Sequence, residues 1–243
     1  MPASSPFLMS LPRQIHLSAG RVPVKVRVSP RARRLALRID AQAEAVELVL
    51  PRRTSVSRAL SFIDENLVWL EKRITALPPR TPLAEGETVP ILDVPHRIRR
   101  VDGARDHKNV WIADGFIHVA ALSDHVPKKI VDFLKEMARG EFQRRAARLA
   151  AELNRTVGRI AVRDTTTRWG SCSANGNLAF SWRLIMAPEE VLNYVVAHEV
   201  AHLVEMNHGA AFWRLVRELV GDVKRPQAWL SQHGAALHRY SAR

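Results

Sequence analysis

Cysteine is almost missing from this sequence, in which Cys172 is the single thiol among 243 residues. One thiol cannot form a disulfide within the chain, and it cannot complete a zinc or iron–sulfur site made of cysteines alone. A metal site in this chain would therefore have to use histidine and carboxylate ligands.

Long apolar runs and a secretory signal are missing as well. Charged residues interrupt each apolar run before it reaches the roughly 18 residues that a membrane span needs. No charged segment precedes an apolar core of secretory length at the N-terminus. We therefore interpret residues 1–20 as an N-terminal tail, and we expect a cytoplasmic protein that does not enter a membrane.

Lysine is scarce, and arginine carries most of the positive charge. The chain has 37 basic and 24 acidic side chains, which gives a net charge of +13, and only seven of the basic residues are lysine. Such a charge suits phosphate or acidic partners, although GC-rich codon usage also enriches a sequence in arginine.

The hydrophobic pattern predicts mixed α and β structure. Apolar residues alternate with polar ones in three short segments of residues 21–51, which predicts strands with a turn near residues 40–43. Over residues 55–77 they recur every third or fourth position, which predicts one amphipathic helix. The Pro- and Gly-containing segment 78–90 indicates a connector, and strands are expected again within residues 91–120.

The second half of the chain begins with another helical pattern over residues 126–153. Two strands joined by the turn sequence SANGN follow within residues 159–187. A further helix starts at Pro188, because Glu189 and Glu190 then lie at the positive end of the helix dipole. Its pattern continues through Met206, and two more helical segments follow it.

The helix that starts at Pro188 carries the sequence H-E-V-A-H, formed by His198, Glu199 and His202. Residues four apart lie on one face of a helix, so the two imidazoles can bind one ion while Glu199 reaches its open side. This pattern is typical of zinc hydrolases. Catalytic zinc normally takes three protein ligands and a water, so a third ligand is required.

Two residues are candidates for the third ligand. His208 follows His202 at the spacing found in metzincins, although Glu205 stands where those proteins have a glycine for the bend. Asn207 or Gly209 could make the bend instead. The rival is Glu218, which forms an E-x-x-x-D pattern with Asp222 in the next helical segment. We favour His208 and keep Glu218 as the alternative.

The run TRWGSCSANGNLAFSWRLIMAPEEVLNYVVAHEVAHLVEMNHGAAFW resembles the YgjP-like family of bacterial metallopeptidase-type proteins, related in motif to SprT-like zinc proteases. The segments VRVSPRARRLALRID and ELVLP are similar to its N-terminal part, so the resemblance covers residues 21–240. It implies Zn²⁺ ligands His198, His202 and His208, with Glu199 as the catalytic residue. We expect an α+β fold with a strand-rich accessory part, 21–125, packed on a zincin-like catalytic part, 126–240, that contains the HExxH helix.

The function that we predict is zinc-dependent hydrolysis of peptide bonds in a polypeptide substrate, with Glu199 as general base. An edge strand such as 177–182 would hold the extended peptide by backbone hydrogen bonds. The first alternative is a metal-dependent nucleotide pyrophosphohydrolase, in which arginines neutralise phosphate charge. No phosphate-binding G-x-x-x-x-G-K-[ST] loop supports it.

The second alternative is a nucleic-acid-associated binding protein in which the metal site is accessory. Residues 21–60 hold ten basic side chains against three acidic ones. The segment from Arg21 to Arg58 therefore predicts weak contact with polyanions, including nucleic acids. No aromatic RNA-binding signature or zinc finger accompanies it.

Overall fold

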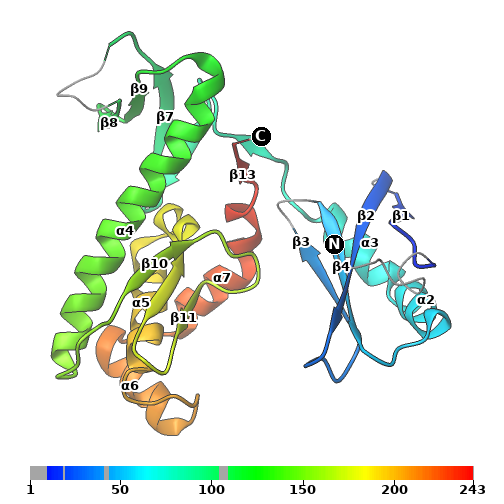
Figure 1. The fold of residues 1–243 in the computed structure, drawn as a ribbon. Coiled ribbons are helices and arrows are strands. Elements are labelled where there is room, and N and C mark those ends of the chain that lie inside the picture. Colours follow the sequence, from blue (N-terminus) through cyan, green and yellow to red (C-terminus); the bar gives the residue numbers. More distant parts are fainter. Residues whose placement is uncertain (1–9, 19, 41–43, 104–108, 243) are drawn as a thin grey trace. The chain divides into compact units, whose positions relative to one another are not determined.

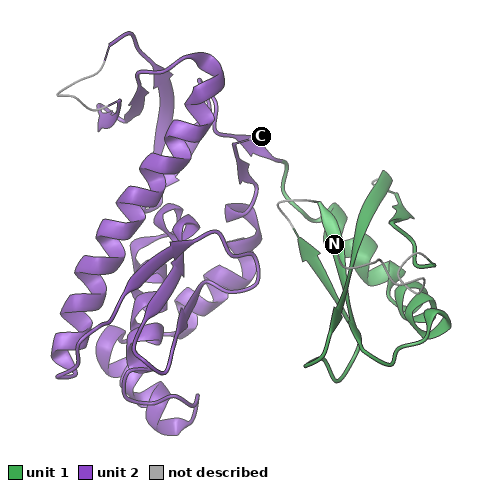
Figure 2. Ribbon diagram, in the orientation of Figure 1, with its two compact units in different colours: residues 1–79 green, residues 80–243 purple. Residues whose placement is uncertain are grey.

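The computed structural model of the chain describes residues 10–18, 20–40, 44–103 and 109–242 (Figure 1). It divides into two compact units, Met1–Pro79 and Arg80–Arg243 (Figure 2). Both units contain helices and strands, so the expectation of mixed α+β structure is confirmed. In the described part of the chain, no helix is both long and apolar enough to cross a membrane.

The first unit is a four-stranded sheet followed by two helices. The strand order is β1-β2-β4-β3, and β2 and β4 run parallel. Its elements are β1 (Gln14–Leu17), β2 (Gly20–Ser29), β3 (Ala36–Asp40), β4 (Ala45–Pro51), α2 (Val56–Glu65) and α3 (Leu67–Thr75). Buried side chains of β4, such as Val46, Leu48 and Leu50, form one core with Ala59 and Ile63 of α2. This unit therefore has a hydrophobic core of its own.

Two features of the first unit differ from the sequence expectations. Gln14–Leu17, within the expected tail, forms β1 because it pairs with β2 and buries Ile15. The expected tail up to residue 9, and residues 41–43 of the expected turn, lie outside the described residues. The helix expected over 55–77 is interrupted at Asn66, whose side-chain amide donates to the carbonyl oxygen of Phe62 at 2.8 Å. A side chain that bonds to its own backbone in this way competes with the helix.

The second unit combines two sheets with four helices. The sheet orders are β6-β7-β9-β8 and β10-β12-β11, and β5 pairs with β13. Its strands are β5 (Thr81–Pro82), β6 (Thr88–Ile91), β7 (Val94–Arg100), β8 (Val110–Ala113), β9 (Phe116–Val119), β10 (Ile160–Arg163), β11 (Gly170–Cys172), β12 (Leu178–Ser181) and β13 (Tyr240–Ser241). Its α-helices are α4 (Val126–Glu152), α5 (Glu189–Ala201), α6 (Ala210–Val220) and α7 (Lys224–Leu237), and η1 (Ser123–His125) and η2 (Trp182–Met186) are 3-10 turns.

The long helix α4 organises this unit (Figure 1). Its buried residues run from Val126 to Ala150, and they share one hydrophobic core with Ile98 of β7, Ile117 of β9 and the buried residues of α5. Phe142 stacks on Phe180 of β12 with 4.6 Å between the ring centroids. The strands that precede α4 therefore share a core with the helices that follow it, and the compact units divide at Pro79 within the connector.

Two details near α5 also differ from expectation. The strand at 177–182 was expected at a sheet edge, which is wrong, because β12 lies between β10 and β11. The helix that was expected to continue to Met206 ends at Ala201. There the amides of Leu203 and Val204 bond to carbonyls three residues back, which tightens the chain into a turn.

Candidate metal centre

Helix α5 is fixed in the core before it reaches its histidines. Most residues of α5 are buried, among them the apolar Val191, Leu192, Val195, Val196 and Val200. The buried guanidinium of Arg145 in α4 donates to Glu189 in the first turn of α5 and to Glu141, at 2.8 Å in each case. The start of α5 is therefore anchored to α4 and its length is packed in the core, which favours a precise position for the histidines at its end.

Three histidines meet at the end of this helix. His198 lies in the last turn of α5, His202 is the residue that caps the C-terminus of α5, and His208 comes from the segment between α5 and α6. Their ligand nitrogens all lie within 4.8 Å of one another, and the Nε2 atoms of His198 and His208 are 3.0 Å apart. Two nitrogens bound to one tetrahedral zinc at 2.0–2.1 Å lie about 3.3 Å apart. The pair formed by His198 and His208 is therefore close to the spacing of two ligands on one zinc ion, and His202 lies near enough to be a third ligand.

The hydrogen bonds and charges of the cluster suit metal binding. Nδ1 of His202 lies 2.9 Å from the carbonyl oxygen of Glu205, to which it donates, and this leaves Nε2 bare for a metal. Burial, with the nearby His202 and His208, lowers the pKa of His198 to about 4, and burial also lowers the pKa of His202. Both rings are therefore neutral near pH 7, which is the form that binds metal. The residues present fit a zinc ion.

Aromatic residues enclose the cluster on the side of α6. Phe212 is fully buried and stacks on His202 with 4.6 Å between ring centroids. Trp213 lies 5.7 Å from the ring of His198, and Tyr194 contacts the same ring edge to face at 6.0 Å. These walls hold the imidazoles in place and keep their surroundings apolar.

Glu199 is buried beside the histidines, with 6% of its surface exposed. Burial raises its pKa to about 7, and the positive charge of Arg168 opposes part of this rise. A carboxyl group with a pKa near 7 can both accept and release a proton at neutral pH. This is the property that a general base needs when it must also act as an acid.

Gly170 of β11 makes the room that Glu199 occupies. A β-carbon at position 170 would lie 2.5 Å from Oε1 and 2.6 Å from Cγ of Glu199. The sequence analysis did not identify this residue. The signal in the sequence was the glycine inside the short strand pattern of RWGSC, because a glycine within a strand often marks a place where another group comes close to the backbone.

Other sequence candidates lie around the centre in different roles. The alternative ligand Glu218 is exposed on α6 and pairs with Arg214 at 3.8 Å, outside the histidine cluster. Cys172 is half-buried, and its pKa is raised by burial and by the charge of Glu199. Arg183 is buried and donates to Asp164 at 2.8 Å and to the carbonyl oxygens of Leu237 and Tyr240. Arg183 therefore links β12 and η2 to the end of the chain.

No curated protein matches this chain. Two solved structures are similar to it: the metallopeptidase zymogens jannalysin of Methanocaldococcus jannaschii and abylysin of Pyrococcus abyssi. Jannalysin is 20% identical, with 37% of this chain and 89% of that chain covered and a TM-score of 0.31. Abylysin is 21% identical, with coverages of 42% and 96% and a TM-score of 0.34.

The family comparison covers far more of the chain. Residues 33–233 match the model of the YgjP-like metallopeptidase domain. This span includes the histidine cluster, Glu199 and most of the first unit. The chain therefore belongs to the YgjP-like family of metallopeptidase domains.

Proposed function

We propose that this chain is a zinc-dependent peptidase in which His198, His202 and His208 hold the metal and Glu199 is the general base. The observation that carries the proposal is the convergence of three imidazole nitrogens within 4.8 Å, next to a buried carboxyl group. When bound, zinc supplies a Lewis acid that activates water and polarises a carbonyl group. We assign this chemistry to a zincin-like part, residues 126–240, with 21–125 as an accessory part.

The role of Glu199 follows from its position and its pKa. The carboxylate accepts a proton from the attacking water, and the same proton then passes to the nitrogen of the leaving amine. No net proton is lost in this cycle. A pKa of about 7 allows both transfers at neutral pH, and Gly170 keeps the carboxylate in place.

An extended polypeptide fits the edge of β11. Among the described strands, β11 pairs only with β12, so its other edge is available. Gly170 of this strand contacts Glu199, so a peptide on that edge would pass beside the general base. Backbone hydrogen bonds to such an edge bind peptides with little demand on their sequence.

The test is a turnover screen of the zinc-loaded protein on unfolded polypeptides and on nucleoside triphosphates. We expect cleavage of polypeptides, and loss of that activity in Glu199→Gln with zinc retained, because the amide keeps the shape without accepting a proton. Hydrolysis of triphosphates alone, abolished by the same substitution, would instead favour the nucleotide pyrophosphohydrolase.

A second candidate function, polyanion contact, is favoured by the register of the first unit. Strands β2 and β4 are parallel, and Ser29 pairs with Pro51 at their ends. The loops that follow both strands therefore begin at the same end of the sheet. They carry Arg31, Arg33, Arg34, Arg52 and Arg53, none of which has an ion pair within the described residues.

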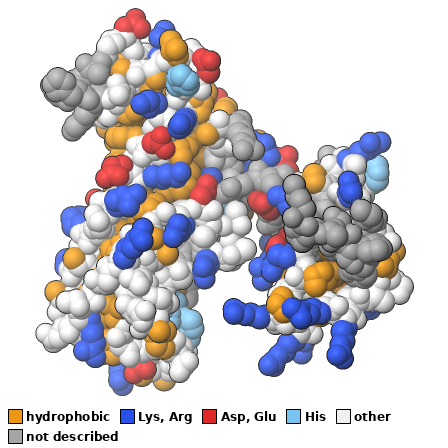
Figure 3. Space-filling model, viewed as in Figure 1, with side chains coloured by type: hydrophobic (Ala, Val, Ile, Leu, Met, Phe, Trp, Pro, Cys, Tyr) orange, Lys and Arg blue, Asp and Glu red, His pale blue; other side chains and the backbone are white. Residues whose placement is uncertain are grey.

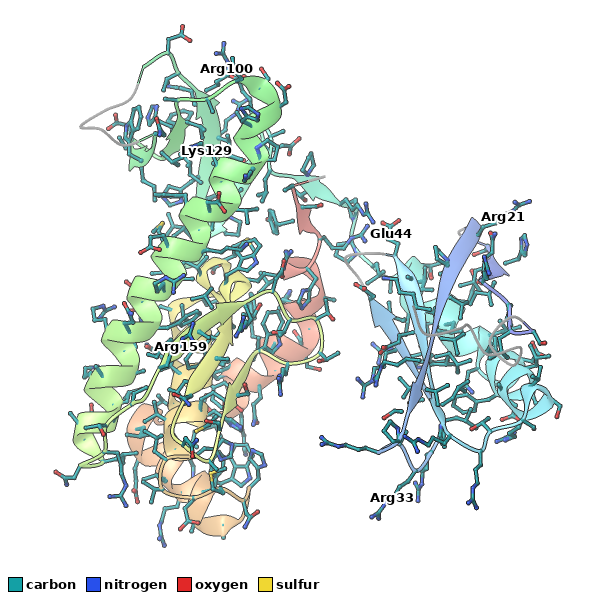
Figure 4. The ribbon with its side chains drawn as sticks, in the orientation of Figure 1. Arg21, Arg33, Glu44, Arg100, Lys129 and Arg159 are labelled. Carbon is teal, nitrogen blue, oxygen red and sulfur yellow. The ribbon has the colours of Figure 1, made fainter. Side chains whose placement is uncertain are left out.

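Figure 3 shows basic side chains gathered along one end of this unit, and Figure 4 labels Arg33 there. The five arginines supply charge without a device that recognises bases. We assign them weak contact with nucleic acids or other polyanions, without sequence preference.

A further inference from the structure

A groove with a volume of about 470 Å³ lies on the small sheet of the second unit. Its floor is a row of small side chains, because Ala161 of β10 pairs with Ala179 of β12, which pairs with Ser171 of β11. The opposite face of the same sheet carries Phe180 and Gly170, toward the core and Glu199. The floor of the groove therefore faces away from Glu199, while Arg168 and Cys172 in its lining interact electrostatically with that carboxyl group.

Three arginines stand over this floor: Arg159, Arg163 and Arg168. All three are exposed, and none has an ion pair within the described residues. Arg159 is labelled in Figure 4 beside the strands of this sheet. We call this groove, with Arg159, Arg163 and Arg168 in its lining, the arginine groove.

No carboxylate lines the arginine groove. Its other lining residues are Cys172, Ser173, Asn177 and Leu178 together with the three floor residues. Asp164, next to Arg163 in sequence, is bonded to the buried Arg183 at 2.8 Å. The guanidinium groups are therefore available for an anionic group from outside, to which arginine can donate two parallel hydrogen bonds.

The polar residues of one wall are fixed in place. The side-chain oxygen of Asn177 accepts from the backbone amide of Arg159 at 2.8 Å, and the hydroxyl of Ser173 accepts from the amide of Asn177 at 3.1 Å. These bonds connect the turn after β11 to the start of β10. The wall is therefore preorganised, which lowers the cost of binding.

The groove extends from β10 across β12 to β11, the strand whose free edge we assign to the polypeptide substrate. Side chains of an extended peptide alternate between the two faces of the sheet that it joins. Every second side chain of a peptide on β11 would therefore point to the face of Ser171, where the arginines lie. No aromatic side chain lines the groove to stack against a nucleotide base.

We infer that the arginine groove is a subsite for Asp and Glu side chains of the polypeptide substrate, so that the enzyme prefers peptides with acidic residues at alternate positions. This inference rests on the proposed peptidase function and adds the class of substrate. Arg159 and Arg163 would bind the carboxylates directly. Arg168, which also lies close enough to Glu199 to affect its charge, is left out of the test for that reason.

The test uses zinc-loaded protein and two fluorogenic peptides that differ only in Glu or Gln at alternate positions around the cleaved bond. We expect kcat/KM to be about tenfold higher for the Glu peptide, as one or two charge-assisted hydrogen bonds imply. In the double variant Arg159→Gln/Arg163→Gln this preference should fall below about threefold. Arg155→Gln, an exposed arginine outside the groove, is the control for loss of charge.

A binding experiment separates this inference from the proposed function. Zinc-loaded Glu199→Gln should bind the labelled Glu peptide more tightly than the Gln peptide, and the arginine substitutions should remove the difference.

If wild-type protein cleaves both peptides equally well, the subsite assignment is wrong and the proposed peptidase function stands. If neither peptide is cleaved but the arginine-dependent binding is present, the subsite stands and the peptidase falls. Displacement of the Glu peptide by ATP at lower concentration than by the unlabelled peptide would overturn the assignment to acidic peptides.

Discussion

The α-carbon of Gly170 lies against the carboxyl group of Glu199, so closely that a β-carbon there would come within 2.5 Å of Oε1. Real β-carbons almost never approach another heavy atom so closely, and Glu199 is buried, with little room to move. The strand β11 and the helix α5 can therefore approach each other this closely because residue 170 has no side chain. The direction of the Glu199 carboxyl group depends on that contact.

We predict that Gly170→Ala lowers turnover by about 100-fold, because displacement of a catalytic group by about 1 Å has an effect of that size. Zinc content should stay at about one equivalent, since Gly170 is not one of the three residues that could hold the metal. Turnover and elemental analysis of the same preparation check both expectations.

The matched control is Gly140→Ala in helix α4, where an added β-carbon meets nothing within 4 Å. That substitution should leave turnover unchanged and stabilise the fold by about 0.5–1 kcal/mol, because alanine is the better helix former. A Gly170→Ala variant that is folded by thermal denaturation and turns over at the normal rate would refute the positioning role.

The third-ligand prediction compares His208 with Glu218. His208→Ala should lower zinc affinity by more than about 100-fold, because removal of a residue that only hydrogen-bonds to a metal ligand already lowers metal affinity by about 10 to 100-fold. Glu218→Ala should change it by less than about threefold, because the carboxylate is exposed and pairs only weakly with Arg214 at 3.8 Å. Competition with a chromophoric chelator measures both affinities. Stronger loss in the glutamate variant would reverse the ligand assignment.

How far the site could be predicted from sequence depended on how local its contacts are. The H-E-x-x-H pattern spans only five consecutive residues, so helical spacing alone brings His198 and His202 together. The resemblance to the YgjP-like family, which is confirmed, rests on the same short motifs. Gly170 contacts Glu199 from another element, and no spacing along the chain reports that approach.

The fold was predictable to a similar degree. Periodicity indicated the helices and strands because it reflects which face of each element is buried. It could not place β12 between two neighbours, since strand order depends on pairing between distant segments. The break at Asn66 was also missed, because the hydrophobic pattern continues across it while one side-chain hydrogen bond interrupts the helix.

The polyanion prediction concerns the loop arginines of the first unit. Binding of single-stranded or duplex DNA should weaken by at least about tenfold between 50 and 200 mM salt, because bound counterions are released from each neutralised phosphate. The triple variant Arg31→Gln/Arg33→Gln/Arg52→Gln should lose most of the affinity and reduce the salt slope.

Its control removes the same charge from β2 itself, in Arg21→Gln/Lys25→Gln/Arg27→Gln. Lys25 and Arg27 pair with Asp40 and Glu47, so they are less available to phosphate. The control should retain most of the binding. Equal losses in the two triple variants would show that net charge, and not the end of the sheet, is responsible.

The last prediction concerns the stability of the metal-free protein, in which the charge of Glu199 is uncompensated by an ion. Burial raises the pKa of Glu199 from 4.5 to about 7. Below pH 4.5 the folded and unfolded chains both hold this proton, so the carboxyl group has no effect on the pH dependence. As the pH rises from 4.5 to 7, the unfolded chain releases the proton while the folded chain keeps it, and folding is progressively destabilised. Above pH 7 the loss is complete.

Glu199→Gln removes this titration while keeping the shape of the side chain. Relative to wild type, the variant should therefore gain free energy of unfolding with pH, by up to about 3 kcal/mol at pH 8, from 1.36 kcal/mol per unit of pKa. Urea denaturation of chelator-treated protein at pH 4.5, 6 and 8 measures the difference, and titrating groups that do not interact with Glu199 cancel in the comparison. Glu218→Gln, an exposed carboxylate, should change stability by less than about 0.5 kcal/mol across the same range. A difference between Glu199→Gln and wild type that stays constant from pH 4.5 to 8 would mean that Glu199 ionises in the folded protein as it does in the unfolded chain, and the argument for a base with a pKa near 7 would fail.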